Sequence, residues 1–302
     1  MQFLAAYIMK GRMQAVTVAA TLAMLSLLFP PLSIVSSASV ALVTLRLGGK
    51  EGLFVLLCAC LVAMLLSMLL LGDYHYALIS AVILWLPVWI MAIILRVGRN
   101  LAVTIEIAVL LGVVAVIGFY GYEAEPKLFW QSMLVMMIQP VLAVQPDVPV
   151  EVVKQFIETI SHYVTGLLAA GSVFSLLFGL LLGRWWQDRL FNPGGFTNEY
   201  LSLKGHVQLA IVTLLLGVAA ALSSGQLAEV CWNVLVVLLV FYCFVGTAVL
   251  HCVFSAMKGR RYLLPIFYVT LFAVPHLMVL IALCGISDAW LNLRNKLKPN
   301  GV

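Results

Sequence analysis

Long runs of apolar residues, separated by short polar loops, account for most of this 302-residue chain. A helix that crosses a bilayer needs about 20 apolar residues. The runs that could do so lie at 13–29, 32–46, 52–72, 76–96, 101–121, 161–183, 206–223, 228–252 and 262–285. The first two are short and meet at Pro30 and Pro31, which interrupt helical hydrogen bonding. The pattern predicts an all-α, polytopic membrane helix bundle with about 8–9 transmembrane helices.

The composition excludes a water-soluble protein. Hydrophobic residues make up 64% of the chain and charged residues only 10%, whereas soluble domains carry about 25% charged residues. A soluble fold of this length would need a polar surface, and too few polar residues are present to build one. The chain is therefore predicted to be an integral membrane protein.

The basic residues fall in every second loop between the apolar runs. They are Lys10, Arg12, Arg46, Lys50, Arg96, Arg99, Arg184, Arg189, Lys204, Lys258, Arg260 and Arg261. Basic loops of membrane proteins face the cytoplasm, so we expect a multi-pass protein with a cytoplasmic N-terminus. The same rule accounts for the net charge of +5 and implies no nucleic-acid partner. The tail departs from it, because nine spans would put Arg294, Lys296 and Lys298 outside.

The region 122–160 reads neither as a span nor as a short loop. Its first part, PKLFWQSMLVMMIQPVLAV, is apolar but contains Gln131 and Pro140. The following PVEVVKQFIETI carries charges at helical spacing. This pattern predicts a re-entrant or interfacial helix followed by an amphipathic helix, on the outer face of the membrane.

The sequence contains no recognisable catalytic or metal-binding set. All six cysteines lie in apolar segments without a Cys-x-x-Cys pair, so neither a disulfide framework nor a zinc site is predicted. No Ser-His-Asp set, metal-spaced histidines or phosphate-binding loop can be assembled. We therefore expect no enzyme, cofactor or metal, and any ATPase would be a separate subunit. Asn233, His251 and His276 are expected to bond to neighbouring helices.

Small residues recur every fourth position on the first predicted span, at Ala15, Ala19 and Ala23. Such stripes let another helix backbone approach closely. Two interpretations stay open. The stripe serves internal packing, or it is a docking face for a partner subunit, since it lies on a terminal helix.

Polar and aromatic side chains gather near the predicted outer ends of the spans. The candidates for substrate binding are Asp73, His75, Tyr120, Glu123, Trp130, Gln131 and His162. An ordinary interfacial belt of aromatic residues is one interpretation. The other is a small-molecule pocket with apolar walls and a few polar groups, covered by the region 122–160.

A polar turn follows the sixth span. The residues Asn192, Pro193, Gly194, Gly195 and Phe196 combine a proline that fixes φ with glycines that permit positive φ. The pattern predicts a rigid cytoplasmic elbow, which is either a partner-binding contact or a simple connector.

Two stretches resemble the YybS-like family of bacterial inner-membrane proteins, a domain of unknown function. They are LFNPGGFTNEYLSLK and the closing GISDAWLNLRNKL, and the span pattern agrees. That family is distantly similar to the S-components of energy-coupling-factor transporters. The resemblance implies a bacterial inner (cytoplasmic) membrane protein, a six-helix first bundle, docking through small residues on the first helix, and an outer ligand site. The elbow and three further spans are additions that S-components lack.

Together these observations predict three parts: an S-component-like bundle at 1–183, the elbow at 184–205, and C-terminal helices with a basic tail at 206–302. The expected function is a membrane subunit that binds a small, partly apolar solute from the outer face for uptake, with a separate energising partner. The alternative is a membrane scaffold that holds protein partners. Membrane lipids and either a protein partner or a second copy of the chain are the expected contacts.

Overall fold

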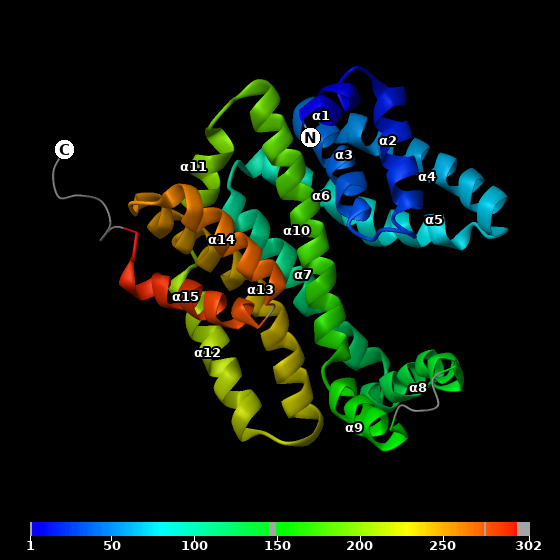
Figure 1. Cartoon of the computed structure of the whole chain (residues 1–302), viewed down its shortest axis with the longest axis vertical. Helices are drawn as coiled ribbons and strands as arrows, with labels where there is room; N and C mark the ends of the chain where they lie inside the picture. The colour runs from blue at the N-terminus through cyan, green and yellow to red at the C-terminus, as the bar shows by residue number, and fades with distance from the viewer. Residues whose placement is uncertain (1, 145–148, 275, 295–302) are drawn as a thin grey trace. The chain divides into compact units, whose positions relative to one another are not determined.

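The computed structural model describes residues 2–144, 149–274 and 276–294 (Figure 1). Within these ranges the regular elements are helices and no strand is present, which confirms the all-α prediction. Five helical segments are long and apolar enough to cross a membrane: α4 (Gly49–Leu71), the segment His75–Gly98, α7 (Leu101–Tyr122), α10 (Val164–Phe191) and α13 (Gly225–Ala256). The chain is a membrane protein on this evidence.

The other helices are shorter. They are α1 (Gln2–Ile8), α2 (Arg12–Leu25), α3 (Leu32–Leu47), α8 (Pro126–Val144), α9 (Val150–Ser161), α11 (Gly195–Leu201), α12 (Val207–Leu222), α14 (Arg260–Ala273) and α15 (Leu277–Leu291). Four of them, α2, α3, α12 and α15, are apolar. At 1.5 Å per residue each is shorter than the roughly 30 Å hydrocarbon core of a bilayer. The count of 8–9 spans therefore stays a prediction.

The predicted single span at 262–285 is wrong, because this stretch forms two helices, α14 and α15. Val274, which ends α14, has φ −127° and ψ 83°. A residue that precedes proline is disfavoured in the helical region, and Pro275 follows. Pro275 itself and the tail residues Lys296 and Lys298 lie outside the described residues.

The segment His75–Gly98 contains a π-helical stretch between α5 (His75–Ser80) and α6 (Leu86–Gly98). It spans Ala81–Trp85 and is followed by Pro87 at the start of α6. Proline cannot donate a backbone hydrogen bond, so a wider helical turn is accommodated there. Trp85 is fully buried and donates from Nε1 to Ser36 Oγ at 2.9 Å. The π-helical turn thus directs a large side chain onto α3.

Two compact units make up the chain. Unit 1 comprises 1–108 and 172–203, and unit 2 comprises 109–171 and 204–302. Helices α7 and α10 contribute residues to both units. The units therefore do not follow chain order as the predicted parts do, and the elbow falls almost wholly in unit 1. Since the units reflect compactness alone, the predicted division into parts stays a prediction.

Small residues bring the helices of unit 1 together. Ala15, Ala19 and Ala23 are at most 1% exposed, and the backbone oxygen of Ala19 accepts a hydrogen bond from Ser36 Oγ at 2.6 Å. Helix α2 packs against α3 and α4 at this face. The stripe is therefore used for internal packing, and the expectation of a free docking face is not met.

Helix α10 uses glycine in the same way. A Cβ atom added at Gly183 would lie 2.7 Å from the Cβ of Ala41. Only glycine permits so close an approach of α10 to α3. This contact holds the C-terminal third of α10 against the C-terminal half of α3.

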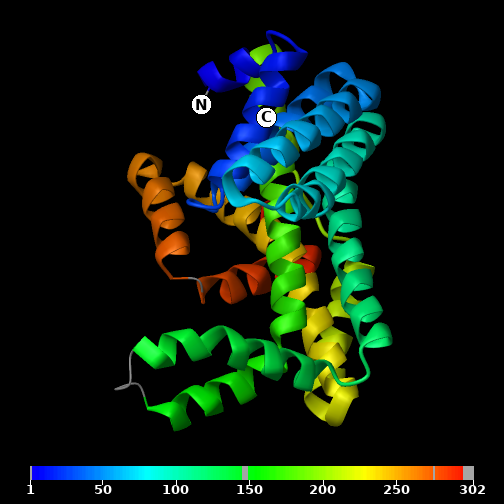
Figure 2. The same ribbon diagram turned by 90° about the vertical axis from the view of Figure 1, so that its right-hand side faces the viewer.

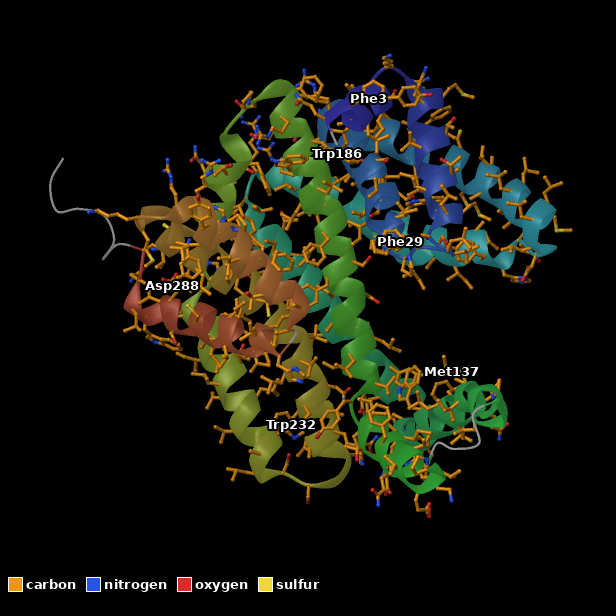
Figure 3. The ribbon with its side chains drawn as sticks, in the orientation of Figure 1. Phe3, Phe29, Met137, Trp186, Trp232 and Asp288 are labelled. Atoms are coloured by element: carbon orange, nitrogen blue, oxygen red, sulfur yellow. The ribbon has the colours of Figure 1, made fainter. Side chains whose placement is uncertain are left out.

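Helix α13 is the centre of unit 2, with α12 and α15 packed along it (Figures 1 and 2). Gly246 and Gly285 let α13 and α15 approach so closely that any Cβ there would meet backbone of the other helix. Asp288 lies near the end of α15 (Figure 3). It accepts hydrogen bonds from Leu293 N at 2.8 Å and Arg294 Nη2 at 2.9 Å. These bonds organise the turn after α15, within the stretch GISDAWLNLRNKL.

Candidate functional site

The amide of Asn233 on α13 is the hub of a buried polar cluster in unit 2. Its Nδ2 lies 3.1 Å from Tyr120 Oη, 2.6 Å from His162 O and 2.7 Å from Glu229 O. Its Oδ1 accepts a bond from Gly166 N at 2.5 Å. Asn233 is 0% exposed. The prediction that Asn233 bonds to neighbouring helices is confirmed.

Other polar atoms of this cluster also bond within the protein. His162 Nδ1 lies 2.6 Å from Glu229 Oε1, and Trp130 Nε1 donates to Thr165 Oγ1 at 2.7 Å. The Trp130 ring packs against Phe119, with centroids 5.4 Å apart. Three predicted substrate-binding residues, Tyr120, Trp130 and His162, thus come together, and they hold α7, α8, α10 and α13 to one another.

The remaining predicted substrate-binding residues do not take part in this hydrogen-bond network. Glu123 and Gln131 belong to unit 2 but form no hydrogen bond with the Asn233 cluster within the described ranges. Asp73 and His75 belong to unit 1 and are exposed. Asp73 accepts a bond from His75 N at 2.9 Å, in the turn before α5. That backbone bond, with a second from the His75 ring, lowers the pKa of Asp73 from its ordinary value.

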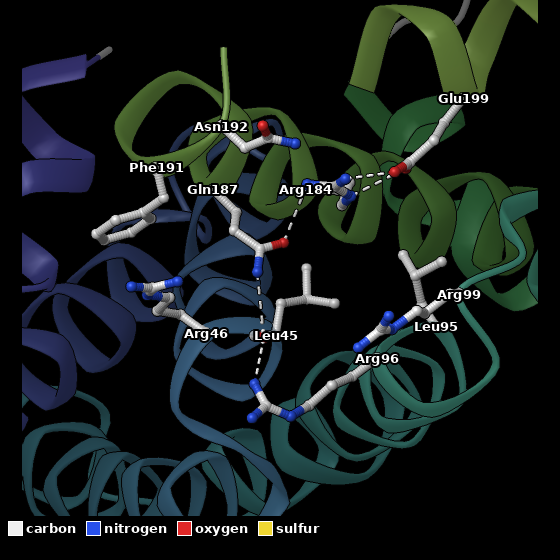
Figure 4. A pocket seen from close by; sticks show the side chains of 10 residues that line it. All are labelled: Leu45, Arg46, Leu95, Arg96, Arg99, Arg184, Gln187, Phe191, Asn192 and Glu199. Carbon is white, nitrogen blue, oxygen red and sulfur yellow. Dashed lines mark hydrogen bonds and ion pairs between the residues drawn. The ribbon is translucent and has the colours of Figure 1, made fainter. Parts of the chain in front are cut away.

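A second polar site lies in unit 1, at a cavity of about 440 Å³ (Figure 4). It is lined by Leu45, Arg46, Leu95, Arg96, Arg99, Arg184, Gln187, Phe191, Asn192 and Glu199. We call it the arginine cavity. The lining contains four arginines and one carboxylate, which gives it a formal charge of +3. The arginines come from the end of α3, the end of α6 and α10.

Two of the arginines have structural roles that account for their positions. Arg96 and Gln187 both donate to the backbone oxygen of Leu45, Gln187 at 3.2 Å (Figure 4). This carbonyl lies in the last turn of α3, where backbone oxygens lack helical partners. Arg46 stacks over Phe191, with its guanidinium carbon 4.1 Å from the ring centroid.

Arg184 forms a bidentate ion pair with Glu199. Its Nε donates to Glu199 Oε2 at 3.0 Å, and its Nη2 bonds to Oε1. Its Nη1 donates to Gln187 Oε1 at 3.1 Å. The Arg184 side chain is only 12% exposed, whereas that of Glu199 is 37% exposed. Bidentate pairing is the strongest form of contact between arginine and a carboxylate.

Arg99 differs from the other three arginines. It ends α6 with φ 49° and ψ 26°, the left-handed conformation that glycine favours. It is exposed, and no hydrogen bond or ion pair of its side chain occurs within the described part of the chain. Left-handed backbone at a non-glycine residue is strained and clusters at functional sites.

The elbow forms the rim of the cavity at Asn192. Its turn is held by Asp188, a 3% exposed residue of α10. Asp188 Oδ2 accepts from Gly194 N at 3.1 Å, and Oδ1 accepts from Phe196 N at 2.8 Å. Gly194 has φ 96°, as the turn prediction required.

Sequence reasoning singled out the elbow but missed Asp188 and the arginine cavity. The signal for Asp188 was an acidic residue four positions before Asn192, in the polar stretch after the predicted span 161–183. The arginines were each assigned to a loop by the positive-inside rule. Their convergence depends on how α3, α6 and α10 pack, which no local pattern reveals.

No family model, curated protein or solved structure matches this chain. The resemblance to the YybS-like family therefore rests on the stretches quoted above. Within the described ranges, no three His, Cys, Asp or Glu side chains group as metal ligands would. Function is argued below from the arginine cavity and the Asn233 cluster.

Proposed function

We propose that this chain is a membrane-embedded binding protein, not an enzyme, and that it recognises an acidic group in the arginine cavity. The observation that carries the proposal is the lining of four arginines around a single carboxylate. A guanidinium presents planar donors that match carboxylate and phosphate oxygens. A cavity of about 440 Å³ is within the usual range for small-ligand sites.

Structural roles explain only part of this charge. Capping of α3 accounts for Arg96, and stacking on Phe191 accounts for Arg46. Arg99 is left with no acidic partner in the described ranges, although it occupies a strained backbone position. Like charges around one cavity repel each other. An acidic ligand would relieve this repulsion and gain charge-assisted hydrogen bonds.

The proposed orientation follows from the basic loops. The positive-inside rule puts the ends of α3 and α6 and the elbow on the cytoplasmic side, so the arginine cavity would open toward the cytoplasm. The short apolar helices α2, α3, α12 and α15 would complete about 8–9 membrane-inserted segments. The resemblance to YybS-like proteins supports placement in a bacterial inner membrane.

Uptake of a small, partly apolar solute from the outer face is the second candidate function. It is favoured by the meeting of Tyr120, Trp130 and His162 beside α8. A separate energising subunit would be needed, as the likeness to S-components implies. In this case Trp130→Phe, which keeps an aromatic side chain but removes the Nε1 donor to Thr165, would weaken solute binding. Thermal unfolding would measure the accompanying loss of the helix contact separately.

The test of the first candidate uses the full-length protein in nanodiscs of neutral phosphatidylcholine. Inorganic phosphate and citrate are titrated at constant ionic strength, and the thermal unfolding midpoint is followed. A ligand at ten times its Kd stabilises the folded state by about 1.4 kcal/mol. We expect both anions to raise the midpoint of the wild type and Arg99→Gln to reduce the shift.

Arg189→Gln is the matched control. Arg189 is an exposed arginine on α10 that stacks over Trp185 and does not line the cavity. Its loss should leave the anion-dependent shift unchanged. Absence of a shift in the wild type, or equal losses in both variants, would refute anion recognition at this site.

A further inference from the structure

Glu199 is the one carboxylate among the ten residues that line the arginine cavity. Its two oxygens contact two nitrogens of Arg184. An external carboxylate or phosphate would approach a guanidinium through the same pair of nitrogens. Glu199 therefore occupies the position on Arg184 that an anionic ligand needs.

The two residues of this ion pair differ in burial and in the length of the helix that carries them. Arg184 belongs to the 28-residue helix α10 and is 12% exposed on its side chain. Glu199 belongs to the seven-residue α11, none of whose residues is buried. The Glu199 side chain can thus turn toward solvent without exposing a packed core, while Arg184 stays in place.

The partial burial of Arg184 explains why an internal carboxylate is present. A guanidinium that is largely removed from water needs an anionic partner. In the absence of ligand, Glu199 supplies that partner. A partly exposed ion pair contributes little to overall stability, so its replacement by a better ligand is energetically feasible.

The charge of the lining identifies the class of ligand. With Glu199 in place the lining still carries a formal charge of +3. A single carboxylate would only duplicate Glu199. A phosphate monoester carries close to two negative charges and has three acceptor oxygens. Such a group has acceptors for Arg184 and for a further arginine of the lining, and so offsets more of the charge than a carboxylate does.

We infer that the arginine cavity is a phosphate-monoester site in which the Glu199 carboxylate pairs with Arg184 until the phosphate displaces it. The inference rests on the proposed function, since it specifies the acidic group that the cavity recognises. The phosphate monoester belongs either to a lipid headgroup, as in phosphatidic acid, or to a soluble phosphorylated metabolite. The chemistry of recognition is the same for both.

The test compares wild type with Glu199→Gln, as full-length protein in phosphatidylcholine nanodiscs. Glycerol 3-phosphate is the phosphate-ester probe and acetate is the carboxylate probe. Removal of an internal competitor raises the fraction of sites that are free to bind. We expect Glu199→Gln to bind glycerol 3-phosphate on the order of tenfold more tightly than wild type, because Arg184 is then unoccupied. Acetate should bind more weakly to both.

Glu51→Gln is the matched control. Glu51 accepts two bonds from Arg12, at 2.8 Å and 2.6 Å, in the same unit but away from the cavity. Breaking this equivalent ion pair should leave glycerol 3-phosphate binding unchanged. If Glu199→Gln does not give a monodisperse protein, Glu199→Ala replaces it with the same expectation.

Two arms distinguish the source of the phosphate. Native mass spectrometry of wild type from nanodiscs that contain phosphatidic acid, a lipid phosphate monoester, should retain a lipid that Arg184→Gln loses, if the headgroup is the ligand. Phosphatidic acid should then compete with glycerol 3-phosphate. If the ligand is soluble, glycerol 3-phosphate binds equally in both kinds of nanodisc.

The inference and the proposed function fail in different ways. A wild type that binds glycerol 3-phosphate, with equal or weaker binding in Glu199→Gln, overturns the displacement of Glu199 but leaves anion recognition standing. Acetate binding as tight as that of glycerol 3-phosphate overturns the phosphate class. A wild type that binds neither probe overturns the proposed function itself.

Discussion

The Asn233 cluster of unit 2 and the arginine cavity of unit 1 are both polar sites in a predominantly apolar chain. They differ in the balance between hydrogen-bond donors and acceptors. In the Asn233 cluster, donors and acceptors match, and the central amide is fully buried. In the arginine cavity, donors exceed acceptors, since the lining contains four guanidiniums and one carboxylate. A matched network stabilises helix packing, whereas an excess of donors is suited to a ligand that brings its own acceptors.

The largest effect on stability is expected at Gly166, where the backbone of α10 lies directly against Asn233. A Cβ atom at Gly166 would lie 2.7 Å from the Cα of Asn233. We expect Gly166→Ala to lower the free energy of unfolding by about 3 kcal/mol, because backbone would have to move. Thermal unfolding in detergent measures the change.

Gly171→Ala on the same helix is the control for this substitution. A Cβ there meets no atom within 4 Å among the described residues. Alanine has the higher helix propensity, so this variant should be as stable as wild type or more so. Equal destabilisation of both variants would mean that the loss at Gly166 does not come from its contact with Asn233, and that the cluster is not tightly closed.

The elbow that borders the arginine cavity provides the next test. Asp188→Ala removes the acceptor for Gly194 N and Phe196 N. We expect the free energy of unfolding to fall by about 2 kcal/mol, because two backbone donors are left without partners. Hydrogen exchange should become faster at both amides. Unchanged exchange would show that the turn holds without Asp188.

Asp288→Ala is the counterpart in unit 2, where Leu293 N loses its acceptor. It should accelerate exchange at Leu293 and leave the elbow amides unaffected. Weaker glycerol 3-phosphate binding is expected only for Asp188→Ala, because only the elbow borders the cavity. A loss of binding in both variants would point to a general loss of structure.

Arg99 allows stability and binding to be separated. Glycine adopts the left-handed backbone conformation without steric strain. In other residues the Cβ atom destabilises this conformation by about 1 kcal/mol. We expect Arg99→Gly to raise the stability of the ligand-free protein by about 1 kcal/mol while it weakens anion binding. Stability comes from thermal unfolding and binding from the glycerol 3-phosphate titration.

Asn292→Gly is the parallel change at the other described non-glycine residue with positive φ, 45°. Asparagine tolerates this conformation, so Asn292→Gly should raise stability less than Arg99→Gly does. Anion binding should not change. A loss of stability in Arg99→Gly would indicate that the Arg99 side chain supports the fold, as those of the Asn233 cluster do.

The smallest effect is expected at the exposed pair Asp73 and His75. The pKa of Asp73 is lowered by bonds from His75, so the ionised form stabilises the turn before α5. This contribution is complete above the ordinary aspartate pKa of 3.8 and is lost as the pH falls through the lower folded value. Protection of His75 N, measured as its exchange rate relative to the intrinsic rate at the same pH, should therefore fall only in acid, and Asp73→Asn should abolish this pH dependence. Unchanged protection in acid in wild type would contradict it.

Local patterns predicted the long helices closely. The predicted spans 52–72, 76–96 and 101–121 differ by a few residues from α4, the segment His75–Gly98 and α7. Apolar runs specify such helices because backbone groups in a bilayer must bond within their own segment. Helix α10 continues through Arg184 to Phe191, beyond the apolar run, since polar residues at its end remain helical.

Pairing between distant segments was not predictable in the same way. The spacing of Ala15, Ala19 and Ala23 suits a partner subunit as well as an internal neighbour. Only the position of Ser36 decides that the stripe is covered within the chain. The predicted outer residues were similarly divided, with Tyr120, Trp130 and His162 in one cluster and Asp73 with His75 in another unit.

By itself, the sequence determined the membrane class, the helical fold and the turn at the elbow, because each depends on hydropathy or backbone preference over a few consecutive residues. Only the tertiary structure decided that Arg46, Arg96, Arg99 and Arg184 line one cavity and that Asn233 joins several helices. These contacts join residues far apart in the chain, and the packing of small residues such as Ala41 and Gly183 fixes which helix ends meet. That packing is a property of the whole fold, since each small residue favours close approach without specifying its neighbour.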